Sequence, residues 1–352
     1  MQLTTTELKG GFVLCVNICF YPLLKSEYNG KQRILFSVPF DLYEYDQLKD
    51  VKHQAMIQII QHRKKLSIDK DERFVRLVQV PCGYCSECLR EKTTSTMFRI
   101  MKETESHKDN WFVTLTYDDA FLPSNHSLIK DEISKFNKKL KVYLNRKGLD
   151  SNFRFYGVGE YGSQFGRPHY HVIYFGLPLI DLKFFKKNEF GDLVYTSEFL
   201  SSVWSKGFVS VGEVSPRSAA YVARYSVKKQ LRSKDEKDRF LELGFVPEFS
   251  VQSMRPGIGF NFLAQSVVNI QNQCYNDYIR GQSYSLPKYY KDRLKKIVPD
   301  AVLESLENRA NLFRDIRLNK ILLTYSDNYY DIIHRKENDI KYRNKLKKKG
   351  TI

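Results

Sequence analysis

The sequence predicts an α+β fold built around a ferredoxin-like, split βαβ core with an antiparallel sheet. From Trp111 onward the expected elements run β-α-β-β-α-β and are followed by a further helix. The strand segments are short runs rich in β-branched and aromatic residues, and they alternate with amphipathic helical stripes. Hydrophobic residues make up 42% of the chain, which is enough to form a packed core.

The first half of this core follows from local patterns. Residues 111–117 (WFVTLTY) are strong β-formers and predict a strand. Residues 128–148 place apolar side chains on one helical stripe with lysines opposite, and Gly148 ends that helix. Residues 152–160 and 169–176 predict two antiparallel strands joined by a loop rich in glycine.

The second half begins with an excursion that turns at Phe190-Gly191. Residues 196–207 then predict a short helix, and residues 208–214 predict a strand. Ser215 followed by Pro216 has the pattern of an N-cap and first helical residue, so a helix should begin there.

The rest of the chain divides around this core at 109–231. Residues 1–81 predict a β-rich region with a hairpin at Asn29-Gly30, and residues 82–108 a cysteine-rich segment and a helix. Residues 232–352 form a basic region that we expect to be mostly helical.

The chain is strongly basic. Its 352 residues include 57 Lys and Arg against 40 Asp and Glu, which gives a net charge of +17. Such a surface attracts polyanions. The 23 Tyr and 24 Phe would mostly lie in the core, but aromatic rings in a basic groove also stack single-stranded bases. The apolar stretch 12–24 is too short to span a bilayer, so we expect a cytoplasmic protein without a membrane partner.

Two tyrosines stand four residues apart in the last predicted helix of the core. Tyr221 and Tyr225 therefore share one helical face, and Lys228 and Lys229 follow one turn later. A phenol attacks a phosphate when a metal polarises the phosphate and cations stabilise the developing charge. The alternative interpretation is a packing pair of rings beside a solvated pair of lysines.

A carboxylate and two imidazoles precede this helix. His169 and His171 share one strand face, and a hairpin would bring Glu160 alongside them. One oxygen and two imidazole ligands leave open positions on a divalent cation. We expect Mg²⁺ or Mn²⁺, because a phosphate in the open positions would add hard oxygens. The alternative is a pair of histidines satisfied by hydrogen bonds within the fold.

Two further sets of residues complete the predicted sites. Cys82, Cys85 and Cys88 have a spacing typical of structural Zn²⁺, with Cys19 as fourth ligand and Cys15 or His107 as substitutes; buried thiols are the alternative. The residues expected to contact DNA are Thr114, Thr116, Arg167 and Arg224.

These residues resemble the signatures of the HUH endonuclease superfamily, and more narrowly the replication initiators of gokushovirus-type microviruses. FVTLTY (112–117), GRPHYHVIYFG (166–176) and AAYVARYSVKK (219–229) resemble three family motifs in the family's order, with Glu160 at the third ligand position. CFYP (19–22), PCGYCSEC (81–88), LTYDDAFLP (115–123) and RPGIG (255–259) agree as well. Arg224 departs from the pattern, which often has lysine there.

The resemblance implies a rolling-circle initiator that nicks viral origin DNA through a 5′-phosphotyrosine bond and rejoins the strand with a second tyrosine. A host DNA polymerase would extend the 3′ end, and a host helicase would unwind the duplex because no GxxxxGK[ST] motif is present. The site of action would be the bacterial cytoplasm.

Two other functions stay open. A transposase or relaxase of the same superfamily would use similar chemistry on other DNA ends. A non-catalytic nucleic-acid-binding protein could use the same fold, although such sheets carry aromatic residues where His169 and His171 stand.

Overall fold

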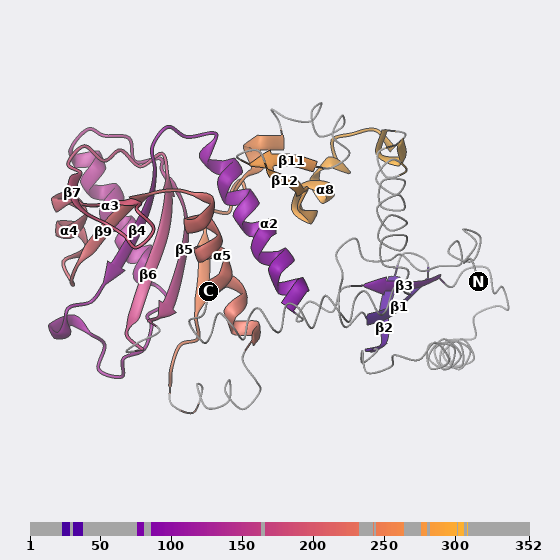
Figure 1. Cartoon of the computed structure of the whole chain (residues 1–352), viewed down its shortest axis with the longest axis horizontal. Helices are drawn as coiled ribbons and strands as arrows, with labels where there is room; N and C mark the ends of the chain where they lie inside the picture. Colours follow the sequence, from indigo (N-terminus) through magenta and orange to yellow (C-terminus); the bar gives the residue numbers. More distant parts are fainter. Residues whose placement is uncertain are drawn as a thin grey trace. The chain divides into compact units, whose positions relative to one another are not determined.

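The computed structural model divides the chain into two compact units, the second of which spans Lys92–Ala310 (Figure 1). It describes residues 23–28, 31–37, 76–80, 86–162, 166–231, 244–263, 276–279, 282–300 and 302–305, with single positions 242 and 308. In the first unit, three strands form an antiparallel sheet in the order β2-β1-β3: β1 (Leu23–Tyr28), β2 (Lys31–Ser37) and β3 (Arg76–Val80).

The hairpin predicted at Asn29-Gly30 is confirmed, since Tyr28 pairs with Lys31 across that turn. The strand predicted at 71–81 is β3. The apolar stretch 12–22 lies outside the described residues. None of the described helices has the length and apolar character needed to cross a bilayer.

The second unit is organised by a seven-stranded sheet in the order β10-β5-β6-β4-β9-β8-β7, and every neighbouring pair is antiparallel. This confirms the predicted mixture of helices with an antiparallel sheet. Its strands are β4 (Asn110–Thr116), β5 (Arg154–Tyr161), β6 (Pro168–Phe175), β7 (Lys183–Lys187), β8 (Leu193–Thr196), β9 (Val209–Glu213) and β10 (Phe249–Gln252).

Helices cover the two faces of this sheet (Figure 1). One face carries α3 (Glu132–Arg146) and α4 (Glu198–Trp204), and the other carries α2 (Ser86–Thr104) and α5 (Pro216–Leu231). The predicted stripe of α3 is its buried face, where Ile133, Phe136, Leu140 and Leu144 lie. The predicted cap of α4 is also present, because the Ser197 side chain accepts from Leu200 N at the start of that helix.

Strand β6 sends alternate side chains to opposite faces, as the pleat requires. Tyr170, Val172 and Tyr174 pack into the core beneath α3. Ile173 and Phe175 pack into the core beneath α2 and α5. The histidines at 169 and 171 therefore face the α5 side, and this parity fixes where the site forms.

The region after α5 contains more strand than expected. Its described part includes β10, which pairs with the edge of β5, the hairpin of β11 (Asn276–Ile279) and β12 (Gln282–Ser285), and the helix α8 (Lys288–Leu294). Four-residue strands carry too little periodicity to be read from sequence. The edge of β5 offers unpaired backbone groups, and tertiary context supplies the partner.

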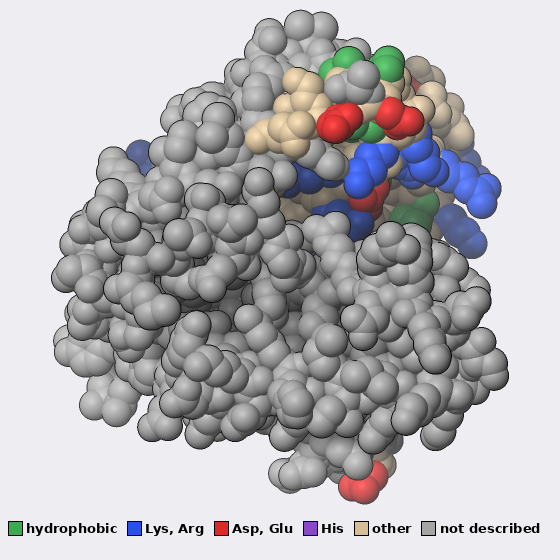
Figure 2. All heavy atoms as spheres, turned by 90° about the vertical axis from the view of Figure 1, so that its right-hand side faces the viewer, with side chains coloured by type: hydrophobic (Ala, Val, Ile, Leu, Met, Phe, Trp, Pro, Cys, Tyr) green, Lys and Arg blue, Asp and Glu red, His purple; other side chains and the backbone are tan. Residues whose placement is uncertain are grey.

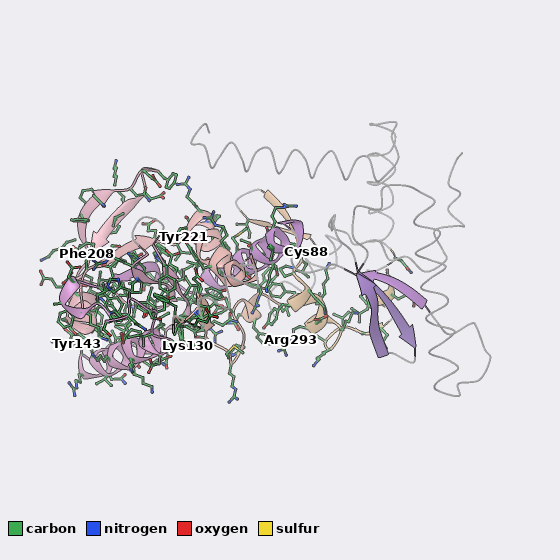
Figure 3. All side chains as sticks on the ribbon, turned by 90° about the horizontal axis from the view of Figure 1, so that it is seen from below. Cys88, Lys130, Tyr143, Phe208, Tyr221 and Arg293 are labelled. Atoms are coloured by element: carbon green, nitrogen blue, oxygen red, sulfur yellow. The ribbon has the colours of Figure 1, made fainter. Side chains whose placement is uncertain are left out.

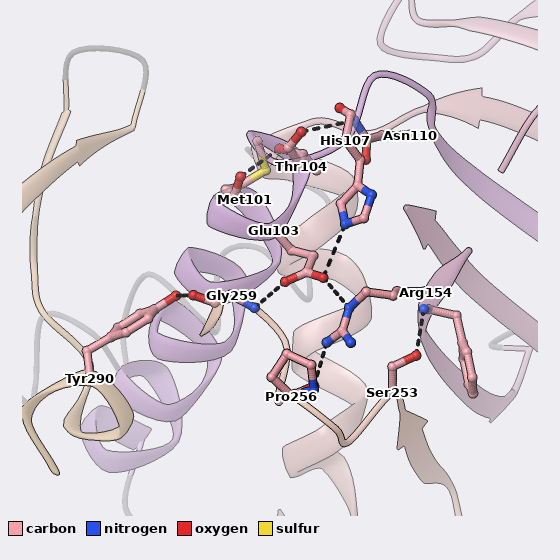
Figure 4. A network of polar contacts seen from close by, with 11 residues as sticks. Met101, Glu103, Thr104, His107, Asn110, Arg154, Ser253, Pro256, Gly259 and Tyr290 are labelled. Carbon is pink, nitrogen blue, oxygen red and sulfur yellow. Dashed lines mark hydrogen bonds and ion pairs between the residues drawn. The ribbon is translucent and has the colours of Figure 1, made fainter. Parts of the chain in front are cut away.

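The predicted turn at RPGIG (255–259) is held by a buried carboxylate of α2 (Figure 4). Glu103 accepts hydrogen bonds from Gly259 N and from the Arg154 guanidinium, which also donates to Pro256 O. His107 lies 3.4 Å from the same carboxylate. Tyr290 of α8 donates to Gly259 O at 2.9 Å, so one cluster joins α2, β5 and α8.

Replacing Gly259 with alanine should lower the free energy of unfolding by about 3 kcal/mol. Gly259 has φ +79°, and an added Cβ would overlap the Tyr290 hydroxyl and lie 2.9 Å from Arg99 O. The control is Gly148→Ala, since that glycine has φ +67° but no atom within 4 Å. Chemical denaturation should show a loss of only about 1 kcal/mol for the control. Equal losses for the two variants would contradict the crowding argument.

Candidate active site

Glu160 and the two histidines meet at one end of β5 and β6, on the face beneath α5. Glu160 is paired with His169 across the two strands, and its Oε1 lies 2.7 Å from His171 Nε2. The rings of His169 and His171 are parallel, with centroids 6.5 Å apart. Glu160 and His171 are buried, and His169 is half-buried. Two of the predicted ligands are thus in contact, and the third stands beside them.

Other groups set the orientation of both imidazoles. His169 Nδ1 donates to Arg167 O at 2.8 Å, and since a carbonyl can only accept, the proton is on Nδ1 and the lone pair on Nε2. His171 Nδ1 lies 2.9 Å from Thr114 Oγ1 on the neighbouring strand. Phe112 stacks on the His171 ring at 5.5 Å. Burial lowers the pKa of His169, which favours the neutral form that ligates metals.

The donor set suits a divalent cation. Glu160 Oε2 is buried and has no hydrogen-bond partner among the described residues, although buried carboxylate oxygens normally have one. The close approach of Glu160 Oε1 to His171 Nε2 requires a proton or a cation near both atoms. As the side chains stand, no three His, Cys, Asp or Glu residues of the described ranges form a complete metal-binding cluster.

Helix α5 brings the tyrosines to this carboxylate. The helix begins as predicted: Ser218 N donates to Ser215 Oγ, and Ser215 N donates to Ser218 Oγ. Ala219 and Ala223 are fully buried, and these small residues let the helix lie close to the sheet. Tyr221 then donates to Glu160 Oε1 at 2.8 Å, and Tyr225 donates to the Tyr221 hydroxyl at 3.2 Å.

The Tyr221 phenol is held in its protonated form. Burial raises its pKa, the negative charge and hydrogen bond of Glu160 raise it further, and Arg224 lowers it. The guanidinium carbon of Arg224, which is exposed, lies 5.8 Å from the Tyr221 ring centre. A cation that shares the Glu160 charge would oppose the effect of that carboxylate on the phenol.

The remaining predicted residues have mixed positions. Lys228 and Lys229 belong to α5, but their side chains lie outside the described part of the structure. Cys88 is half-buried near the start of α2, while Cys15, Cys19, Cys82 and Cys85 lie outside the described residues, so the zinc site stays a prediction. The other substitute ligand, His107, faces Glu103 instead.

The residues expected to contact DNA also bond within the fold. The Thr116 hydroxyl donates to Phe208 O at 3.0 Å. The Arg167 guanidinium donates to Tyr117 O and to Asp119. Thr114 contacts His171, a role that the sequence did not indicate because it depends on the register of β4 against β6, where Thr114 pairs with His171. Phe112 was missed for the same reason.

Comparison with known proteins places these elements in one family region. The model of a family of replication-associated proteins, described by the name ORF2, matches residues 110–230, which contain β4 through α5. The chain is 34% identical over 236 residues to replication-associated protein ORF2 of Spiroplasma virus 4, covering 65% of this chain and 71% of that protein. No solved structure matches the chain.

Two further phage proteins are similar. The chain is 33% identical over 227 residues to replication-associated protein VP4 of Bdellovibrio phage phiMH2K, covering 64% of this chain and 70% of that protein. It is 30% identical over 230 residues to replication-associated protein ORF4 of Chlamydia phage 1, covering 63% of this chain and 55% of that protein.

Proposed function

Because the chain belongs to the replication-associated protein family of microviruses, we propose that it is the nickase that starts rolling-circle replication of a phage genome. In this proposal it cuts one strand of origin DNA, stays linked to the 5′ end through a tyrosine, and later rejoins the strand with a second tyrosine. The observation that carries the proposal is the chain of contacts from Tyr225 through Tyr221 and Glu160 to His171.

The fold is consistent with an HUH nuclease core of ferredoxin-like type. Strands β5, β6, β4 and β9 are adjacent in that order, with α3 between β4 and β5 and α4 between β6 and β9. That order and connectivity are those of a split βαβ unit, in which the two central strands carry the predicted ligands or their partners. Strands β7, β8 and β10 extend this core at its two edges.

Glu160, His169 and His171 would hold the Mg²⁺ or Mn²⁺ ion. A bound cation of this kind polarises a phosphate and stabilises the charge that develops during displacement. Imidazole nitrogens also suit Zn²⁺ and Co²⁺, so metal choice would depend on the phosphate oxygens in the open positions.

The side chains of α5 would carry the covalent step. A tyrosine oxygen attacks the scissile phosphorus, the bond from phosphorus to the 3′ oxygen breaks, and the proton lost by the phenol is balanced by the one gained by the leaving 3′-OH. One phosphodiester replaces another, so the second tyrosine can reverse the exchange. Lys228 and Lys229, one turn beyond Tyr225, would add positive charge near the phosphate.

Partners follow from the same proposal. Viral origin DNA is the substrate, and a host polymerase extends the released 3′-OH. A host helicase unwinds the duplex, and the reaction takes place in the bacterial cytoplasm. The net charge of +17 favours association with DNA. In Figure 2, Lys and Arg side chains gather on the visible part of the described surface.

A nicking assay tests the proposal. Supercoiled DNA carrying the viral origin is incubated with the protein in Mg²⁺ or Mn²⁺, and open circles are counted after protease treatment. We expect nicked circles whose 5′ ends resist kinase labelling, because a peptide blocks them. EDTA should stop the reaction. Nicking that is unchanged in EDTA, or that leaves free 5′ ends, would contradict the proposal.

Replacing Thr114 with valine is expected to weaken Mn²⁺ binding by about tenfold. The change removes the hydroxyl that contacts His171 Nδ1 and keeps a side chain of the same shape. Groups that orient a ligating histidine typically contribute roughly 10–100-fold to metal affinity. Titration calorimetry measures the effect, and Thr116→Val serves as control because that hydroxyl bonds to Phe208 O. An unchanged affinity in Thr114→Val would show that this contact does not position the ligand.

A further inference from the structure

The α5 face of the sheet is covered over only part of its width. Helix α5 packs on β5, β6 and β10. On β4 and β9, the side chains of this face belong to Thr114, Thr116 and Ser210, which are half-buried, and to Phe208, which is 45% exposed. Val209 and Val211 point to the opposite face, into the core beneath α3 and α4. An open strip of sheet therefore lies beside α5.

This strip is continuous with the candidate active site. His169 pairs with Thr116 across β6 and β4, and both the backbone N and the hydroxyl of Thr116 donate to Phe208 O. Two strand spacings, or about 10 Å, thus separate β6 from β9. Figure 3 shows Phe208 and Tyr221 on one side of the second unit and Tyr143 of α3 on the other.

A second exposed ring extends the strip onto the inserted hairpin. All five residues of β7 are exposed, and the ring of Phe185 lies 5.5 Å from that of Phe208. Phe184 instead pairs with Tyr195, whose ring packs against the core beneath α3 and α4, so Phe184 faces away from the strip. The hairpin turn is ordered by Asn188, whose side chain accepts from Phe190 N and Asp192 N.

Positive charge accompanies these rings. Lys186 Nζ lies 5.6 Å from the Phe185 ring centre, and Lys187 follows it. The nearby carboxylates are engaged, since Asp192 pairs with Arg217 and Glu198 pairs with Lys183. Lys186 and Lys187 have no ion pair within the described residues. Exposed rings interleaved with unpaired lysines suit a polyanion with flat bases better than they suit an apolar protein surface.

We propose that Phe185 and Phe208 form a stacking platform for single-stranded DNA that leads away from the scissile phosphate across β4 and β9. The proposal rests on the proposed nickase function and assigns it a binding surface. At about 3.4 Å per nucleotide in stacked DNA, the distance from β6 to β9 corresponds to about three nucleotides. The rings would stack bases with little sequence preference, and Lys186 and Lys187 would contact phosphates.

The test is the affinity of the full chain for a fluorescent oligothymidine, measured by anisotropy in EDTA so that no cleavage occurs. Loss of a stacked aromatic weakens single-strand binding by about 5–150-fold per base. We expect Phe185→Ala and Phe208→Ala each to weaken binding by at least about tenfold. Phe185→Trp should restore it, because the ring face is kept. Both rings are largely exposed, so neither alanine variant should change the fold.

Phe184→Ala is the matched control, because it removes a neighbouring exposed ring from the opposite face. The proposal is overturned if Phe185→Ala and Phe208→Ala bind like the unmodified protein, or if Phe184→Ala weakens binding equally. A platform that serves another protein instead of DNA would give the first of these results. The nickase proposal fails separately, when the unmodified chain binds the oligonucleotide but forms no covalent adduct with origin DNA in Mn²⁺.

Discussion

Replacing both Tyr221 and Tyr225 with phenylalanine is expected to abolish the covalent protein–DNA adduct, with a fall in nicking of at least about 1,000-fold. The two hydroxyls are the phenols that contact the carboxylate and imidazole cluster, through Glu160. Removing a nucleophile removes the covalent pathway itself, whereas removing a positioning group only slows it. The adduct is measured by transfer of label from a 3′-labelled origin oligonucleotide to protein on a denaturing gel.

The matched control for this experiment is Tyr143→Phe. Tyr143 stacks on Phe199 at 4.4 Å on the α3 face, so its hydroxyl lies away from the site. Adduct formation should be unchanged in this variant. Adducts that persist in the double variant would show that another residue attacks the phosphate, and the role assigned to α5 would be wrong.

Replacing His171 with alanine should remove both nicking and the stabilisation of the fold by Mn²⁺. His171 is the imidazole in contact with Glu160, and Thr114 and Phe112 fix its ring. A ligand at 100 times its dissociation constant adds about 2.7 kcal/mol to the free energy of unfolding. We expect that gain in the unmodified protein and none in the variant, together with a loss of nicking of at least about 100-fold.

His126→Asn is the control for that measurement. His126 is an exposed histidine with φ 56°, a conformation that asparagine also adopts, so the change removes an imidazole without straining the backbone. Its gain in stability from Mn²⁺ should equal that of the unmodified protein. Stabilisation by Mn²⁺ that survives in His171→Ala would move the metal away from this cluster.

Much of the central sheet and its helices could be predicted because local pattern and tertiary structure agree there. The stripe of α3, the Ser215–Pro216 start of α5 and the hairpin of β5 and β6 are each encoded within about 20 residues, a span over which periodicity is informative. The shared face of Tyr221 and Tyr225 follows from helical spacing, and that of His169 and His171 follows from the strand pleat.

What could not be predicted depends on pairing between distant segments. The contact of Thr114 with His171 joins positions 57 residues apart, and its existence depends on the register of β4 against β6. The addition of β10 to β5 is likewise set by an available sheet edge and not by its four residues. Phe185 and Phe208 meet only because β8 lies between β7 and β9, an order that local pattern does not carry.

The most direct test of the site is to identify the residue that becomes linked to DNA. After reaction with an origin oligonucleotide in Mn²⁺, trypsin should cut after Arg217, Arg224 and Lys228, which places Tyr221 and Tyr225 on different peptides. Mass spectrometry after nuclease digestion should find a 5′-phosphorylated nucleotide on residues 218–224 or 225–228. A nucleotide on any peptide outside α5, or efficient nicking with no linked peptide, would contradict the account.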